Sequence, residues 1–224
     1  MKSFKPIVFT CIVQLLIGLI CIPNIYGQDP LRYKAEIEKF ESASSVDSKN
    51  LTVFAGSSSI KLWKNLAESF PGKNVLNRGF GGSQMSDLIY YSDEVILRYK
   101  PVTVFIYEGD NDFGSGKSPE EVLNNARKLI GIIHTRLPDT KIVFITPKPS
   151  LKRWDDGYKD NYLTYNDMLK KMDKEYRFVK VVDVWNIMLD KNGMPAEGLF
   201  LQDCLHMTEA GYALWSKKMK RYVP

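Results

Sequence analysis

The 224-residue chain contains only two histidines, and they stand in different surroundings. His206 lies near the C-terminus, three residues after Asp203, whereas His134 falls late in an apolar helical stretch, a position that favours a structural role. A neutral imidazole can accept the proton of a serine hydroxyl, and an aspartate at this spacing can turn back to hold the other ring nitrogen. The pair therefore predicts the general base and the orienting acid of a hydrolase with a serine nucleophile.

Candidate partners for this pair lie in three further polar segments. Ser57, Ser58 and Ser59 follow a short apolar run, and the segments 77–83 and 108–112 follow two others. A Gly-Ser run is most often only a turn, so each segment by itself indicates little. Their meaning depends on whether the fold brings them together.

The elements that must position these segments alternate along the chain, after a polar helical lead at 31–42. Strands are predicted at 51–55, 74–76, 102–107, 141–146 and 178–182, and helices at 83–99, 118–136, 161–176 and 208–222. The apolar runs are typical of strands buried on both faces of a parallel sheet. The alternation predicts an α/β fold, a single-domain three-layer sandwich with about five parallel strands. Ligands bind at the carboxyl ends of such strands, where the polar segments lie.

Together the four segments resemble the conserved blocks of the SGNH (GDSL-type) hydrolase superfamily, in the same order and at similar spacing. The resemblance runs from Val53 to the last helical stretch. Gly56-Ser57-Ser58 is similar to the Gly-Asp-Ser block, which implies that Ser58 is the nucleophile. The Asp-x-x-His block matches Asp203 and His206, which would complete the catalytic group.

The resemblance also implies an oxyanion hole made by the N–H groups of Ser58 and Gly82 and the side-chain amide of Asn111. It implies a flavodoxin-like sheet and an esterase or acylhydrolase that needs neither metal nor cofactor. Two positions depart from the family pattern. Ser57 stands where the family usually has aspartate, and Met207 replaces a proline, which would loosen the loop.

Other interpretations of the motifs fit less well. The segment 114–118 resembles a phosphate-binding loop, but Asn111 occupies the position of its first glycine, and Ser118 with Pro119 favours a helix N-terminus instead. Gln84 stands where a dinucleotide-binding fingerprint needs a glycine. Ile60 stands where the nucleophile elbow of an α/β-hydrolase needs a glycine. Two histidines without metal-ligand spacing indicate no metal site. A catalytically inactive carbohydrate-binding module of the same fold remains an alternative.

The N-terminus has the pattern of a signal peptide over residues 1–27, which would leave an esterase domain at 28–224. A positive start precedes the apolar run 7–22, which is short for a membrane span, and a retained anchor is the alternative to cleavage. Cleavage would remove Lys2 and Lys5 and no acidic residue, so the net charge of +5 would fall to +3. That mild charge indicates no nucleic-acid partner. We expect a secreted or periplasmic protein without a stable membrane association, and with Cys204 as its single cysteine.

The loop 147–160 is long for a link between a strand and a helix and contains Lys148, Lys152, Arg153 and Trp154. It could form a wall of the site or be a solvated surface loop. The sequence has no lid-like apolar insertion for long acyl chains. The expected substrates are therefore short acyl esters, preferably O-acetyl groups on carbohydrate, with a lysophospholipase or lipase-type acylhydrolase as the alternative.

Overall fold

A computed structural model of the chain describes residues 29–41 and 46–224, so the expected signal peptide at 1–27 lies outside the described residues. Five strands form one parallel sheet in the order β2-β1-β3-β4-β5. They are β1 (Thr52–Gly56), β2 (Val75–Gly79), β3 (Thr103–Tyr107), β4 (Lys141–Ile145) and β5 (Val179–Val182). The predicted five-stranded α/β fold is confirmed.

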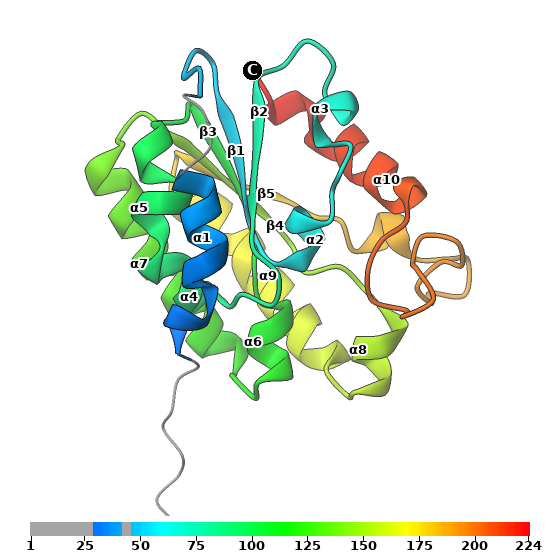
Figure 1. Ribbon diagram of the computed structural model, residues 1–224. Coiled ribbons are helices and arrows are strands. Elements are labelled where there is room, and N and C mark those ends of the chain that lie inside the picture. Colours follow the sequence, from blue (N-terminus) through cyan, green and yellow to red (C-terminus); the bar gives the residue numbers. More distant parts are fainter. Residues whose placement is uncertain (1–28, 42–45) are drawn as a thin grey trace, which may run out of the picture.

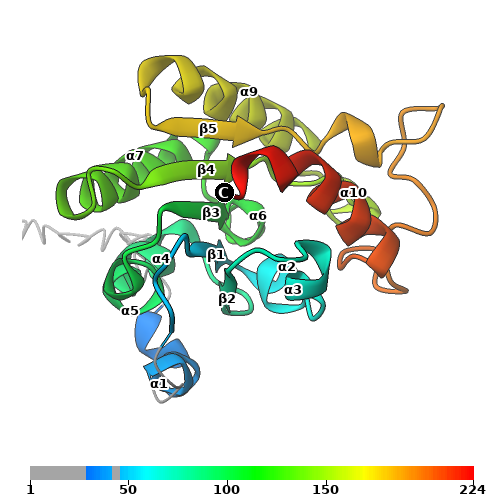
Figure 2. The same cartoon turned by 90° about the horizontal axis from the view of Figure 1, so that it is seen from above.

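Helices cover both faces of the sheet and give three layers (Figures 1 and 2). One face carries α1 (Lys34–Glu41), α4 (Met85–Tyr90), α5 (Ser92–Val95), α7 (Pro119–Arg136) and α9 (Lys159–Glu175). The opposite face carries α2 (Ser58–Lys61), α3 (Leu66–Ser69) and α10 (Glu209–Met219). Two further short helices, α6 (Asp110–Gly114) and α8 (Leu151–Asp155), lie at one end of the sheet. Short 3₁₀ turns occur at Pro30–Tyr33, Leu97–Tyr99, Asn186–Met188 and Lys220–Tyr222.

Successive side chains of each strand point to opposite faces of the sheet, so each strand contributes to both apolar layers between the sheet and the helices. On β3, Val104 and Ile106 pack toward α7 and α9, whereas Phe105 and Tyr107 pack toward α10. Both sets are fully buried, as expected for a central parallel strand. Trp63 is buried against Tyr212 of α10. No helix within the described ranges is long and apolar enough to cross a membrane.

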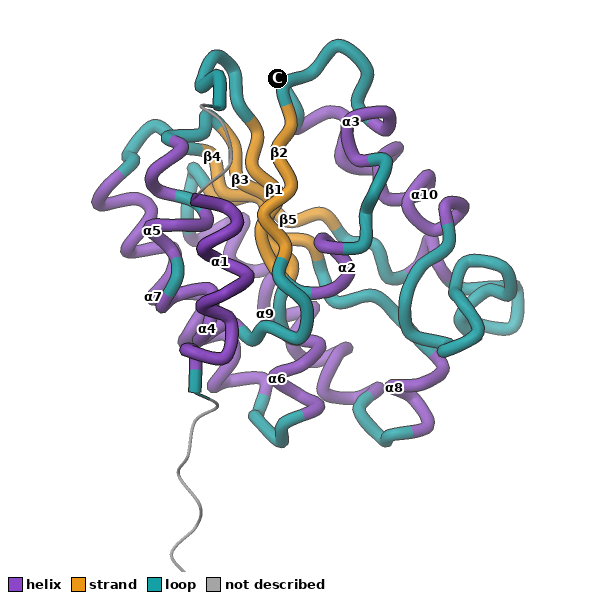
Figure 3. Tube along the Cα trace, in the orientation of Figure 1, coloured by secondary structure: helices purple, strands orange, loops and turns teal. Residues whose placement is uncertain are grey.

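The structure corrects two expected elements. The stretch 83–99 is not one helix but breaks at Tyr91 and at Ile96 into α4, α5 and a 3₁₀ turn. The second break lies within the consecutive buried residues Val95, Ile96 and Leu97, which would point in different directions around a straight helix. The expected loop 147–160 contains α8, whereas the segment between β5 and α10 is mostly loop (Figure 3).

Candidate active site

The turn after β1 places Ser58 at the carboxyl edge of the sheet. Gly56 has a φ of 134°, a conformation that favours glycine. A Cβ there would lie 2.1 Å from the carbonyl oxygen of Tyr107 on β3. The buried Ser57 donates its backbone N–H to the same oxygen at 3.2 Å. The chain can therefore turn at once into α2, whose first residue is Ser58.

Ser58, His206 and Asp203 form a continuous hydrogen-bonded chain of side chains. His206 Nε2 lies 3.0 Å from Ser58 Oγ, although the two residues are 148 positions apart in the sequence. His206 Nδ1 lies 2.6 Å from Asp203 Oδ2. Because Asp203 accepts at Nδ1, the neutral ring carries its proton there and leaves Nε2 free to accept from Ser58. The structure thus brings together the three side chains that the sequence singled out.

Asp203 is fixed by the backbone of its own loop. Its Oδ1 accepts from the N–H groups of Leu205 at 3.0 Å and His206 at 2.9 Å. Partial burial raises the pKa of Asp203, but the hydrogen bonds from the His206 ring and from these two N–H groups outweigh burial and lower the pKa to about 2. The carboxylate is therefore ionised at every pH at which an esterase is normally assayed.

The loop around His206 is also tied to the preceding segment. Leu201 donates its N–H to the carbonyl of His206 at 2.7 Å, and Thr208 donates to the carbonyl of Leu199 at 3.0 Å. Between these bonds the side chain of Met207 is buried. The loop is therefore held by backbone hydrogen bonds around a buried Met207, and the expected loosening by methionine stays a prediction.

Three hydrogen-bond donors converge on the same edge of the sheet. The loop after β2 passes the end of β1, where Phe80 donates to the carbonyl of Gly56 at 2.9 Å, and it continues to Gly82, with a φ of 81°. Asn111, in α6 after β3, donates its Nδ2 to the carbonyl of Ser83 at 2.9 Å. The N–H groups of Ser58 and Gly82 donate to no other residue in the described part of the chain. Because β2, β1 and β3 are neighbours, Gly82 and Asn111 lie on the loops that flank Ser58.

A buried carboxyl group holds Ser83 from its other side. Ser83 Oγ donates to Glu108 Oε1 at 2.6 Å, and both side chains are buried. Burial, together with the negative charge of Asp112, raises the pKa of Glu108 well above its ordinary value. Ser83 is thus held by Glu108 through its side chain and by Asn111 through its carbonyl.

An ionic network that the sequence did not reveal lies behind Asn111. Asp110 accepts from Lys148 Nζ at 3.1 Å, from Arg153 Nε at 2.8 Å and from the Tyr162 hydroxyl at 2.6 Å. Burial by itself raises the pKa of Asp110, but the charges of Lys148 and Arg153 outweigh it and hold the pKa well below its usual range. Arg153 Nη2 also reaches Asn111 Oδ1 at 3.4 Å. The sequence held one signal of this network. Lys148 and Arg153 lie in the segment after β4, and Asp110 follows the neighbouring strand β3.

The remaining sequence candidates have structural roles. His134 stacks on Phe178, with ring centroids 3.8 Å apart. Lys117, the lysine of the apparent phosphate loop, pairs with Asp112 at 2.9 Å, and Ser118 caps α7 together with Glu121. These contacts account for that motif within the fold.

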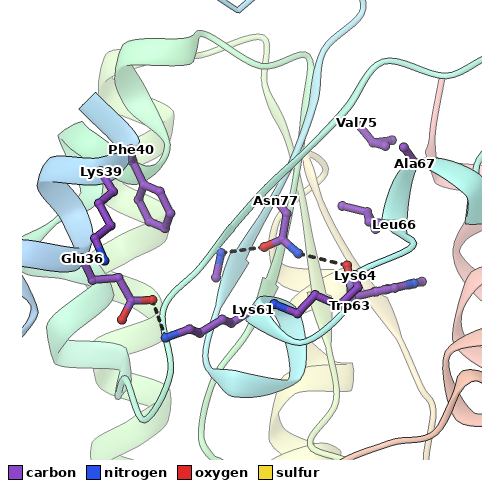
Figure 4. A pocket seen from close by; sticks show the side chains of 11 residues that line it. Glu36, Lys39, Phe40, Lys61, Trp63, Lys64, Leu66, Ala67, Val75 and Asn77 are labelled. Atoms are coloured by element: carbon purple, nitrogen blue, oxygen red, sulfur yellow. Dashed lines mark hydrogen bonds and ion pairs between the residues drawn. The ribbon is translucent and has the colours of Figure 1, made fainter. Parts of the chain in front are cut away.

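A cavity of about 530 Å³ lies beside edge strand β2, between α1 and the segment of α2 and α3 (Figure 4). Lys61 closes one end through a 2.8 Å ion pair with Glu36. The side chain of Asn77 covers the strand edge by accepting from the Gly79 N–H at 2.9 Å and donating to the Ile60 carbonyl at 2.6 Å. None of the three hydrogen-bonded side chains Ser58, His206 and Asp203 lines this cavity. Within the described residues, no three histidine, cysteine or acidic side chains are arranged to hold a metal ion.

Comparisons with known proteins agree with this architecture. The model of the GDSL-like Lipase/Acylhydrolase family matches residues 50–214. No curated protein sequence matches the chain.

Several solved structures share the fold at low sequence identity. A candidate platelet activating factor from Streptococcus pneumonia is 24% identical, with a TM-score of 0.75 over 86% of this chain and 92% of that one. A candidate acylhydrolase from Bacteroides fragilis is 18% identical, with a TM-score of 0.74 over 88% and 98% of the two chains. A variant of an acetyl xylan esterase from Geobacillus stearothermophilus is 18% identical, with a TM-score of 0.64 over 80% and 96%.

Proposed function

Because the chain belongs to the GDSL-like lipase/acylhydrolase family and is a carboxylic ester hydrolase, we propose that it removes short acyl groups, O-acetyl groups on carbohydrate first among them, with Ser58 as its nucleophile. The observation that carries the proposal is the 3.0 Å contact between Ser58 Oγ and His206 Nε2. It joins a hydroxyl to a base that Asp203 already orients at 2.6 Å.

The mechanism follows from these contacts. His206 Nε2 accepts the hydroxyl proton as Ser58 Oγ attacks the ester carbonyl, and Asp203 stabilises the imidazolium that forms. The ring then gives the proton to the leaving alcohol, which leaves an acyl group on Ser58. Water, activated by the same ring nitrogen, releases the acid and restores the serine.

The negative oxygen of each tetrahedral intermediate needs fixed donors. We assign this role to the N–H groups of Ser58 and Gly82 and to the amide hydrogen of Asn111 that Ser83 does not use. All three donors are neutral and held by the fold, so they stabilise the developing charge without reorganising.

The exposure of the site supports a small acyl group on a bulky alcohol. The side chains of His206 and Asp203 are 25% and 46% exposed, so the leaving-group side of Ser58 opens to solvent. An ester on a sugar chain can approach such a surface, whereas a long acyl chain requires an apolar groove to bury it. The similar fold of an acetyl xylan esterase supports the same choice.

An acyl-length series tests the proposal. Turnover is measured on 4-nitrophenyl acetate, butyrate and octanoate and on acetylated xylo-oligosaccharides, with Ser58→Ala as the control. We expect kcat/KM to be highest for acetate and the sugar ester, and to vanish in the variant. A maximum at octanoate would favour the lysophospholipase or lipase alternative, and sugar binding without hydrolysis of any ester would show an inactive module.

We also propose that residues 1–27 direct export and are removed, so that the mature domain begins at Gln28 in the periplasm or outside the cell. N-terminal sequencing of the protein from fractionated cells tests this. An uncleaved Met1 in the cytoplasmic fraction contradicts it.

A further inference from the structure

We propose that Arg153 is a positioning residue of the oxyanion hole, which acts by holding and polarising the side-chain amide of Asn111. The inference rests on the proposed function, because it assigns a new residue to the same reaction. Arg153 has no hydrogen bond or ion pair to Ser58, His206 or Asp203, and among the proposed site residues its one hydrogen-bond partner is Asn111.

The guanidinium of Arg153 lies beside both ends of α6. Its Nε donates to Asp110 Oδ1 at 2.8 Å, and its Nη2 donates to Asn111 Oδ1 at 3.4 Å. At the far end of α6, Gly114 leaves room for the group, since a Cβ there would lie 3.0 Å from Nη1. One side chain of α8 thus hydrogen-bonds to the first two residues of the helix that carries Asn111 and lies beside its last residue.

These contacts select one orientation of the amide. Arg153 presents a donor to Asn111 Oδ1, and Ser83 presents a carbonyl acceptor to Nδ2 at 2.9 Å. A flipped amide would set its NH₂ group against the guanidinium and its oxygen against the carbonyl, and both contacts would be repulsive. Arg153 and Ser83 therefore keep an N–H, rather than an oxygen, directed toward the substrate.

The charges of Asp110, Lys148 and Arg153 also favour the Asn111 amide as a hydrogen-bond donor. Lys148 is buried and the Arg153 side chain is only 15% exposed, so two cations share the buried carboxylate of Asp110. Asp156, 3.5 Å from Arg153, is also paired with Lys152 and is more exposed. The group of Asp110, Lys148 and Arg153 therefore carries a net positive charge. It draws electron density from the amide through Oδ1 and makes Nδ2 a stronger donor to an oxyanion.

A double-mutant cycle on the full mature chain tests the inference. Arg153→Met removes the contact and the charge, and Arg153→Lys keeps a cation for Asp110 but lacks the fork that also reaches Asn111. Each variant is made in the natural chain and in an Asn111→Ala chain. Turnover is measured on 4-nitrophenyl acetate, with thermal melting to follow the fold. Lys152→Met is the matched control, because it removes a positive charge from the neighbouring position of α8 without touching α6.

We expect both Arg153 variants to lower kcat about tenfold, a fraction of the loss of a whole donor, with KM within about twofold. In the Asn111→Ala chain the same changes should alter kcat less than about twofold, because the amide they act on is gone. Equal losses in both chains, or natural turnover in Arg153→Lys, overturn the proposal. If the natural chain hydrolyses no ester, or Ser58→Ala remains active, the proposed function itself fails, which is a different outcome.

Discussion

The Asn111 side chain and the Ser83 carbonyl are joined by a 2.9 Å hydrogen bond that uses one of the two amide hydrogens. The bond leaves the second amide hydrogen for the oxyanion contact that we propose. It also couples the loop after β2, which carries Gly82, to the loop after β3. Two of the three proposed donors therefore hold one another in place before any ester binds.

Removing the Asn111 amide should affect turnover rather than binding. In Asn111→Ala we expect kcat to fall by about 10²–10³, because one donor to the tetrahedral intermediate is lost, while KM changes little. Steady-state kinetics on an acetyl ester measures both constants. Asn111→Asp should have a still lower kcat, since a carboxylate repels the oxyanion. A kcat of Asn111→Ala within threefold of that of the natural enzyme would contradict the assigned role.

Asp203→Asn should lower kcat/KM while leaving the fold intact. The variant loses the negative charge opposite the imidazolium and can offer an N–H to Nδ1, which favours the wrong tautomer. Because Asp203 is 46% exposed and water can replace part of its effect, we expect a loss between about 10² and about 10⁴. His206→Ala is the reference for complete loss of the base. An Asp203→Asn enzyme as active as the natural one would remove the residue from the mechanism.

Two glycine-to-alanine changes should shift stability in opposite directions. Gly56→Ala places a Cβ 2.1 Å from a backbone oxygen at a φ of 134°, so we expect the free energy of unfolding to fall by more than about 3 kcal/mol. Gly131→Ala, on the exposed face of α7 with no atom within 4 Å of the new Cβ, should raise it by about 0.5–1 kcal/mol. Urea denaturation measures both, and similar values for the two variants would contradict the packing described here.

Glu108→Gln should stabilise the protein increasingly as the pH rises. Burial and the charge of Asp112 raise the pKa of Glu108 well above 4.5, so the native state keeps a proton that the unfolded chain releases above that pH. The natural protein has the full stability that this proton contributes below pH 4.5. Between pH 4.5 and the raised pKa of Glu108, its free energy of unfolding falls by at most about 1.4 kcal/mol per pH unit. Glutamine can still accept from Ser83 and does not titrate. Unfolding free energies at pH 4, 6 and 8 test this, and a difference between variant and natural protein that stays constant with pH speaks against it.

The sequence was sufficient for the parts of the site that depend on strand ends. The apolar runs at 102–107 and 141–146 predicted strands β3 and β4, and the loops after the strands placed Ser58 and Asn111 at one edge. The contact between His206 and Ser58 followed from the scarcity of histidine and from the resemblance, not from local patterning. Long apolar strands have few alternative arrangements, so their placement is robust.

The direction of charged side chains could not be predicted in the same way. The loop that contains Lys148 and Arg153 was expected either to form a wall of the site or to be a solvated surface loop, because the partner that holds both side chains lies more than 35 positions away, in another loop. Only their contacts with Asp110 show that both side chains turn inward. The break at Ile96 was hidden for a similar reason, since helical periodicity does not show that three consecutive apolar residues will all be buried.

The 148 positions between Ser58 and His206 bear on how activity arises during synthesis. A growing chain carries its nucleophile early, on the first strand-to-helix turn, but the base and its aspartate arrive together in one short loop near the end. In the proposed mechanism the serine has no proton acceptor until that loop has settled beside α2, so an incomplete polypeptide is inert toward esters. Recovery of hydrolysis on refolding should accordingly report the docking of this C-terminal loop, which the optical signals of the sheet do not measure.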